Sequence, residues 1–111
     1  MVYELMANTY TNAKLDLTTT NVTTLYTCPA STVAVIKSIL VSEDSNNADT
    51  ITVTVTNGSS VYSLFKVKAV AANTTIELLT APLILQTTEI LKVNAASANR
   101  LHVVASLLEV S

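Results

Sequence analysis

The chain is poor in the residues that build catalytic and cofactor sites. Its 111 residues include one glycine, two prolines, one cysteine, one histidine and no tryptophan. A single glycine excludes the glycine-rich loops that hold phosphate groups, and a single cysteine excludes an internal disulfide framework. Only 13% of the residues are charged, and the net charge is −2. The few lysines and the one arginine are scattered and form no basic stripe, so we expect no nucleic acid partner.

What the chain has in quantity is apolar and β-branched residues. Half of the residues are hydrophobic, and about one residue in six is threonine. Such residues suit a pleated, half-buried surface, which favours an all-β fold. The length fits one domain with a real core. Because so few charges accompany so much apolar content, we expect part of the surface to be covered by other chains, and a homo-oligomer is one such arrangement.

The N-terminal residues show no clean period. Residues 1–12 are therefore predicted to form an arm, followed by a β-sandwich domain over residues 13–111. The sequence MANTYTNAKLDL, which begins at Met6, is an alternative start, and residues 1–5 would then be an upstream extension. The first ten residues lack the features of a signal peptide, and no apolar run reaches the roughly 18 residues that span a bilayer, so no membrane partner is expected.

From residue 13 onward, short β candidates alternate with polar breaks, and no helical period of useful length occurs. This spacing predicts a single β-sandwich or jelly-roll-like domain of about eight antiparallel strands. The clearest hairpin joins residues 50–56 to residues 60–68, because Asn57-Gly58 suits a type I′ turn. The candidate segments are 13–17, 22–27, 31–42, 50–56, 60–68, 73–79, 83–85, 89–94 and 100–110.

The longest candidate strand, residues 31–42, is apolar on both of its faces. A strand of this kind must be covered on both sides, which indicates either the centre of a sandwich or a contact with another subunit. Simple alternation assigns the side chains to two groups. One face would hold Val33, Val35, Ile39 and Val41, and the other would hold Ala34, Ile36 and Leu40.

No residue can be nominated for a catalytic, cofactor or metal site. His102 is the only histidine and is interpreted as a strand residue on a less apolar face. Cys28 precedes Pro29 at a strand end and is interpreted as a small buried filler, not a nucleophile. The oxygens of the segment 43–49 make Ca²⁺ binding conceivable, but the segment lacks the glycine turn and terminal bidentate glutamate of an EF-hand, so it is interpreted as an exposed loop.

The aromatic residues are too few and too scattered to form a platform that stacks on sugars or bases. Packing in the core or at an interface is the expected role of these side chains. The residues considered for such a platform are Tyr10, Tyr26, Tyr62 and Phe65.

The chain resembles small virion structural proteins of tailed phages, notably those of aquatic bacteria. The likeness begins with MANTY at Met6, continues through LYTCPASTVAVIKSILV from Leu25, includes the TVTV hairpin, and ends with LQTTEILKV at Leu85–Val93. It covers roughly residues 6–111. The resemblance implies a component without enzymatic activity that binds capsid, neck or tail proteins, and it brings no catalytic residues with it.

We therefore expect a phage virion protein, assembled in the host cytoplasm, that acts as a head decoration (cement) protein. The candidate surfaces are an exposed strand edge at residues 13–17 and an apolar face at residues 33–41. A neck, baseplate or tail-fibre component is an alternative within the same class. A small carbohydrate- or ion-binding β-module is the alternative from another class.

Overall fold

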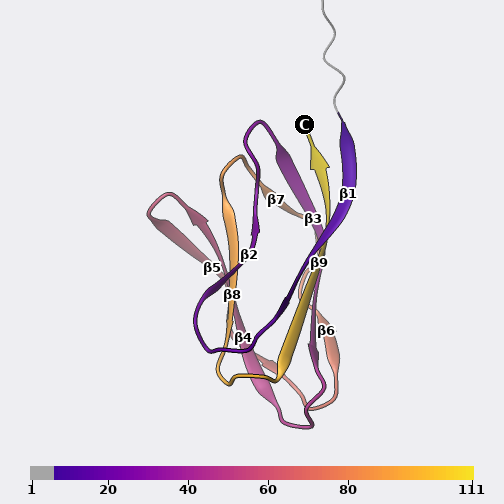
Figure 1. Cartoon of the computed structure of the whole chain (residues 1–111), viewed down its shortest axis with the longest axis vertical. Coiled ribbons are helices and arrows are strands. Elements are labelled where there is room, and N and C mark those ends of the chain that lie inside the picture. Colours follow the sequence, from indigo (N-terminus) through magenta and orange to yellow (C-terminus); the bar gives the residue numbers. More distant parts are fainter. Residues whose placement is uncertain (1–6) are drawn as a thin grey trace, which may run out of the picture.

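A computed structural model describes residues 7–111 as nine β-strands in two antiparallel sheets (Figure 1). The predicted all-β sandwich is confirmed. This part of the chain has no helix long and apolar enough to cross a membrane. In the first sheet, β9 and β3 are central, β1 forms one edge, and two short strands pair with different parts of the other side of β3. The first sheet consists of β1 (Asn8–Asp16), β9 (Leu101–Val110), β3 (Val33–Glu43), β6 (Thr75–Glu77) and β7 (Leu83–Leu85).

The second sheet has four strands in the order β2, β8, β4 and β5. The predicted hairpin forms β4 and β5, and β2 lies at the opposite edge of the sheet. Its strands are β2 (Thr23–Thr27), β8 (Ile90–Ala95), β4 (Asp49–Asn57) and β5 (Ser60–Val70).

The core lies between the inner faces of the two sheets. Alternate residues of the central strands are fully buried there, as the period of two along a strand requires. Each large aliphatic side chain buried in this way contributes about 1.5–3 kcal/mol relative to an exposed one. The largest fully buried aliphatic side chains are Leu17, Ile36, Ile39, Val41, Ile51, Val53, Val70, Leu85, Leu91, Leu101 and Leu107.

A β-bulge at Lys37 divides the long strand β3 into two registers. Ile36 lies opposite Leu107 of β9, but Ser38 lies opposite Ser106, so Lys37 has no partner. The extra residue reverses the alternation beyond it, because successive side chains of a strand point to opposite faces. The predicted division of this strand into two faces was therefore wrong. The inward side chains are Ala34, Ile36, Ile39 and Val41, and the outward ones are Val33, Val35 and Leu40.

The β4–β5 hairpin turns one residue later than predicted. Asn57 pairs with Ser60, so the two-residue loop consists of Gly58 and Ser59. Gly58 has a φ of +61°, and neither Asn57 nor Ser59 has a positive φ. A positive φ at the first loop position alone is typical of a type II′ turn, in which glycine takes that position.

The strand predicted to begin at Ala13 begins earlier. Asn8–Asn12, which belonged to the predicted arm, form the first part of β1 and pair with β9 without a break. These residues are exposed, so their pairing depends on backbone hydrogen bonds that leave no apolar pattern in the sequence. Residues 1–6 of the predicted arm lie outside the described residues. The strand is an edge of the first sheet, as expected for residues 13–17.

Candidate functional site

An apolar row crosses four strands on the outer face of the first sheet. Tyr10 of β1 lies opposite Leu108 of β9, Leu108 lies opposite Val35 of β3, and Val35 lies opposite Ile84 of β7. The ends of the row are well exposed, since Tyr10 is 75% and Ile84 50% accessible to solvent. We call this set of four residues the apolar row. No part of the second sheet covers it, because the second sheet packs on the opposite face.

A second row of paired residues on the same face has opposite charges at its two ends. Lys14 lies opposite Val104, Val104 opposite Leu40, and Leu40 opposite Glu77. The lysine is on β1 and the glutamate on β6, so apolar side chains separate the two charges. Leu40 is 39% exposed. The outer face therefore combines exposed apolar side chains with a lysine at one edge and a glutamate at the other.

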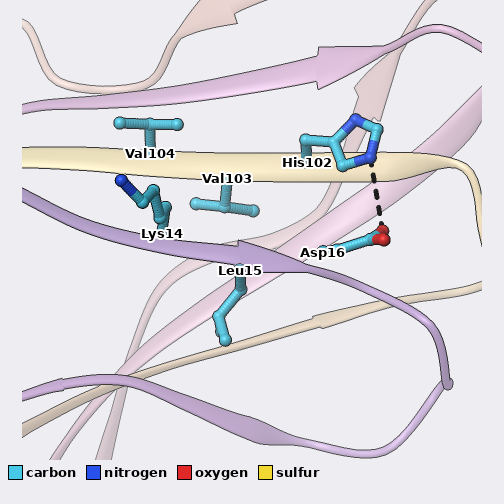
Figure 2. A pocket seen from close by; sticks show the side chains of 6 residues that line it. All are labelled: Lys14, Leu15, Asp16, His102, Val103 and Val104. Atoms are coloured by element: carbon cyan, nitrogen blue, oxygen red, sulfur yellow. Dashed lines mark ion pairs between the residues drawn. The ribbon is translucent and has the colours of Figure 1, made fainter.

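Shallow hollows lie on this face along β1 and β9. One hollow of about 280 Å³ is lined by residues 14–16 of β1 and residues 102–104 of β9 (Figure 2). The other is lined in part by Tyr10, Ser106 and Lys37. The bulged Lys37 places its ammonium 5.9 Å from the centre of the Tyr10 ring, within the range of a cation–π contact. The bulge thus brings a side chain of β3 to the edge strand β1.

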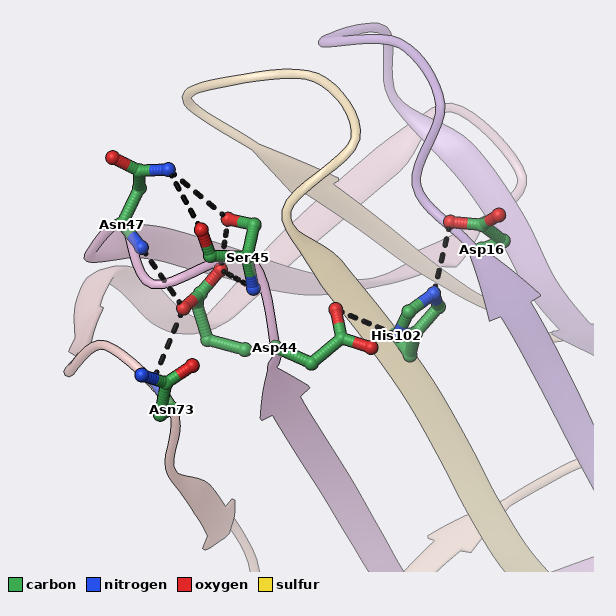
Figure 3. A network of polar contacts seen from close by, with 7 residues as sticks. Asp16, Asp44, Ser45, Asn47, Asn73 and His102 are labelled. Atoms are coloured by element: carbon green, nitrogen blue, oxygen red, sulfur yellow. Dashed lines mark hydrogen bonds and ion pairs between the residues drawn. The ribbon is translucent and has the colours of Figure 1, made fainter.

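His102 lies between two aspartates at one end of this face (Figure 3). Its Nε2 is 3.3 Å from Asp16 of β1, and its Nδ1 is 3.7 Å from Asp44, which follows β3. The histidine is half exposed on the outer face of β9. Within residues 7–111, no group of three or more histidine, cysteine, aspartate or glutamate side chains is arranged to hold a metal ion.

Glu43 is buried, and its carboxylate organises the loop that follows β3. Its partners Ser45, Asn47 and Asn73 are labelled in Figure 3. Its carboxylate accepts hydrogen bonds from the backbone N–H of Ser45 at 2.8 Å, Asn73 at 3.0 Å and Asn47 at 3.2 Å, and also from the Ser45 hydroxyl. Burial alone would raise the pKa of Glu43, but these bonds favour the charged form and lower its pKa to about 2. The carboxylate therefore stabilises the loop as an anion.

The segment 43–49 is less exposed than predicted at both of its ends. Glu43 is 1% and Asp49 7% exposed, and each belongs to a strand. Asp49 accepts hydrogen bonds from the backbone N–H groups of Thr50 and Ser97. The reason for the difference is that both carboxylates satisfy backbone amides inside the fold, a role that composition does not reveal. Their oxygens are thus directed at N–H donors.

Cys28 is buried, as predicted. It is 1% exposed, and its thiol lies 3.3 Å from the carbonyl oxygen of Thr32 and 3.6 Å from that of Leu85. Burial raises the pKa of the Cys28 thiol, which disfavours the reactive thiolate. The side chain fills a place in the core beside the turn into β3.

The aromatic residues within residues 7–111 divide between the core and the surface. Tyr26 and Phe65 pack against the core, whereas Tyr10 and Tyr62 are exposed. The Tyr26 hydroxyl donates a hydrogen bond of 2.5 Å to Glu109, which joins β2 of the second sheet to β9 of the first. Burial and this carboxylate raise the pKa of Tyr26 well above its usual value. The sequence did not separate these two groups, because core or interface packing was the expected role of all four side chains.

A second exposed apolar region lies on the edge strand β5. Val61 is 63%, Tyr62 58% and Val67 60% exposed. Between β5 and the segment that links β6 to β7 lies an apolar groove of about 330 Å³. The sequence predicted the strand at residues 60–68 but not that these apolar side chains would be exposed. The groove is lined by Leu64, Phe65, Leu78, Leu79, Thr80, Ala81, Pro82 and Leu83.

No protein-family model matches the chain, and no curated protein matches it. Among solved structures, it is similar to a chain described as "Cyanophage Pam1 capsid asymmetric unit". The two are 17% identical, the match covers 95% of this chain and 84% of that one, and the TM-score is 0.43. At this level, the likeness transfers neither a fold nor a function to the present protein.

Proposed function

We propose that the protein is a structural component of a phage virion without enzymatic activity, and that it decorates the capsid through the outer face of its first sheet. The observation that carries this proposal is the apolar row. Four apolar side chains from β1, β9, β3 and β7 are aligned on a face that no other part of the described chain covers. The sequence resemblance to phage virion proteins supports the same class.

The energetics of this face suit a contact made in many copies. Apolar surface contributes roughly 25 cal/mol for each Å² removed from water, so a partner that covers the apolar row gains affinity without a deep pocket. A capsid offers many equivalent sites, and self-association of the protein would add avidity to each contact. The exposed Lys14 and Glu77 at the two sides of the second row would orient the partner.

A role without catalysis agrees with the use of the acidic groups. The carboxylates of Glu43, Asp49 and Glu77 accept hydrogen bonds from backbone N–H groups and stabilise loops and strand ends. Cys28 is buried, and His102 is flanked by exposed aspartates with no nucleophile among its contacts. These arrangements are structural, and they give no nucleophile, base and orienting group in one place.

The proposal is tested by binding to purified heads of the phage that encodes the chain, prepared without the protein. Full-length protein should sediment with the heads and saturate at a fixed ratio to the capsid subunits. Ile84→Glu, at the exposed end of the apolar row, should reduce this binding at least tenfold. Thr24→Glu, on the outer face of the second sheet, is the matched control and should bind normally.

Absence of binding by the unaltered protein would contradict the proposal, as would equal losses in the two variants. Binding to isolated tails or necks but not to heads would place the protein elsewhere in the virion and contradict decoration. Labelling of the protein in imaged particles separates these positions directly.

A further inference from the structure

The edge strand β1 is long and regular, unlike the other strand edges of the described chain. It pairs with β9 from Asn8 to Asp16 without a register shift. Edge strands are commonly protected against pairing by bulges, short length and charged residues. β2 has five residues and a register shift, and β6 and β7 have three residues each.

β5 carries the strongest protection of these edges. Its pairing with β4 contains two register shifts, and Lys66 and Lys68 lie on it. Between them, Val67 has a φ of +53°, a conformation that a β-branched residue rarely adopts. The bulged backbone at Val67 interrupts the edge, whereas β1 offers nine residues in an unbroken register.

The backbone of β1 directs alternate residues to its free edge. The N–H of Ser111 donates to the carbonyl of Ala7 at 3.1 Å, and the N–H of Leu17 donates to that of Leu101 at 3.0 Å. Because the direction alternates along a strand, odd-numbered residues face β9 and even-numbered residues face outward. In residues 7–111, no bond outside the strand ladders uses the N–H of Asn8, Tyr10, Asn12, Lys14 or Asp16.

We propose that β1 pairs antiparallel with β1 of a second copy, about a two-fold axis at Asn12. In this register, Asn12 faces Asn12 of the second copy, and each outward residue exchanges N–H···O bonds with its opposite number. Residues Asn8–Asp16 of one copy then pair along their whole length with the same residues of the second copy. The carbonyl of Asp16 also accepts a hydrogen bond from the N–H of Thr18 at 3.0 Å within its own chain. The two first sheets become one continuous sheet.

The side chains of β1 are complementary to themselves in this register. Lys14 lies opposite Tyr10 of the second copy, where the ammonium can approach the ring, and Asp16 lies opposite Asn8. No like charges face each other. Since the outward residues carry their side chains on the outer face, the apolar rows of both copies lie on the same side of the joined sheet.

This pairing specifies how the self-association mentioned in the proposed function would occur. It rests on the self-association and not on capsid binding. Cysteine cross-linking of the full chain tests it. Residues opposite each other in a hydrogen-bonded pair have Cα atoms about 5.5 Å apart, within the roughly 4.4–6.8 Å that a disulfide spans. Asn12→Cys should therefore form a covalent dimer under mild oxidation. The native Cys28 is 1% exposed, so the unaltered protein is the blank.

The matched controls distinguish this register from others. Asn8→Cys alone and Asp16→Cys alone should stay monomeric on denaturing gels, whereas a mixture of the two should cross-link. In sedimentation equilibrium, Asn12→Asp and Asn12→Lys should each raise the dimer dissociation constant up to about fivefold, and their mixture should restore it.

Cross-linking of Asn12→Cys that is no faster than that of Asn8→Cys would overturn the pairing, and so would a monomer at all concentrations. The outcome for capsid binding is separate. Capsid binding by a monomer would overturn the pairing and leave the proposed function in place. Specific cross-linking without capsid binding would support the pairing and contradict decoration.

Discussion

The two sheets share one core but differ in their outer faces. On the second sheet, the outward residues of β4 are all threonines, and they lie beside Ile90, Lys92 and Asn94 of β8 and Val61 of the edge strand β5. On the first sheet, the corresponding positions form the apolar row and its neighbours Leu40 and Val104. A face that stays in water is usually polar, so this difference supports the proposal that the outer face of the first sheet contacts a partner.

The same contrast explains why one chain can be so apolar. The core accounts for the inward residues of both sheets, and the threonine-rich face accounts for the polar ones. Two groups of exposed apolar side chains remain: the outward residues of the first sheet, such as Val35 and Leu108, and the residues of the edge strand β5 described above. These side chains contribute little to the core because they point away from it. Their contribution is therefore expected in an interface.

The largest difference in unfolding free energy is expected between an inward and an outward residue, and two neighbours on β7 allow this comparison. Leu85 is fully buried, whereas Ile84 is 50% exposed. Leu85→Ala should lower the free energy of unfolding by about 2–5 kcal/mol, because it leaves a cavity in the core. Ile84→Ala should change it by about 0.5 kcal/mol or less. Urea unfolding of both variants measures the difference, and equal losses would show that Ile84 also supports the core.

A second test extends the comparison to acidic residues. Because the folded pKa of Glu43 is about 2, below its usual 4.5, its ionised form stabilises the fold above pH 4.5, and this stability is lost as the pH falls toward 2. Glu43→Gln should lower the melting temperature at pH 7, and its difference from the unaltered protein should shrink below pH 4.5. The exposed Asp44 supplies the control, since Asp44→Asn should lower the melting temperature much less. A pH-independent difference for Glu43→Gln would contradict this role.

A third test concerns the bulge that separates the two faces of β3. Deletion of Lys37 should give a regular strand in which Ile36 and Ile39 still point inward. The deletion should therefore be tolerated, at a cost of about 1 kcal/mol in the free energy of unfolding. Thermal unfolding followed by circular dichroism measures it. Loss of the cooperative transition would mean that Lys37 does not occupy a bulge.

The smallest change in the free energy of unfolding is expected for substitutions on the outer faces of the two sheets, measured in the free protein. Ile84→Glu and Thr24→Glu both lie on outer faces, so each should change the free energy of unfolding by no more than about 0.5 kcal/mol. Any difference between them should appear only on binding to phage heads. A large loss of stability in Ile84→Glu alone would assign the apolar row to folding and not to an interface.

Much of the fold could be predicted because its signals are local. Turn residues such as Gly58 and alternating runs such as that of β4 mark the strands, and every predicted segment overlaps a strand. The bulge at Lys37 could not be predicted, because it is defined by the pairing of β3 with β9. One unpaired residue was enough to exchange the predicted faces of β3.

The candidate site was less predictable for the same reason. The apolar row joins residues from four strands, and only their registers place Tyr10 and Ile84 on one line. The segments that carry them give no hint of this when read singly. The burial of the Glu43 carboxylate likewise depends on a hydrogen bond from the N–H of Asn73, which lies on a loop distant in the sequence. The apolar residues of the segment 33–41 were identified as candidates, but which of them lie in the core and which on the surface depends on the bulge seen in the structure.

In the virion, the outer face of the first sheet is expected to be covered by a neighbouring protein. A cryo-electron microscopy map of the virion, in which this domain is fitted, would show which face is covered. We predict that Tyr10, Val35 and Ile84 are buried against a neighbouring protein, while the threonines of β4 face the solvent. A map in which the apolar row faces the solvent and the second sheet contacts the particle would contradict the claim.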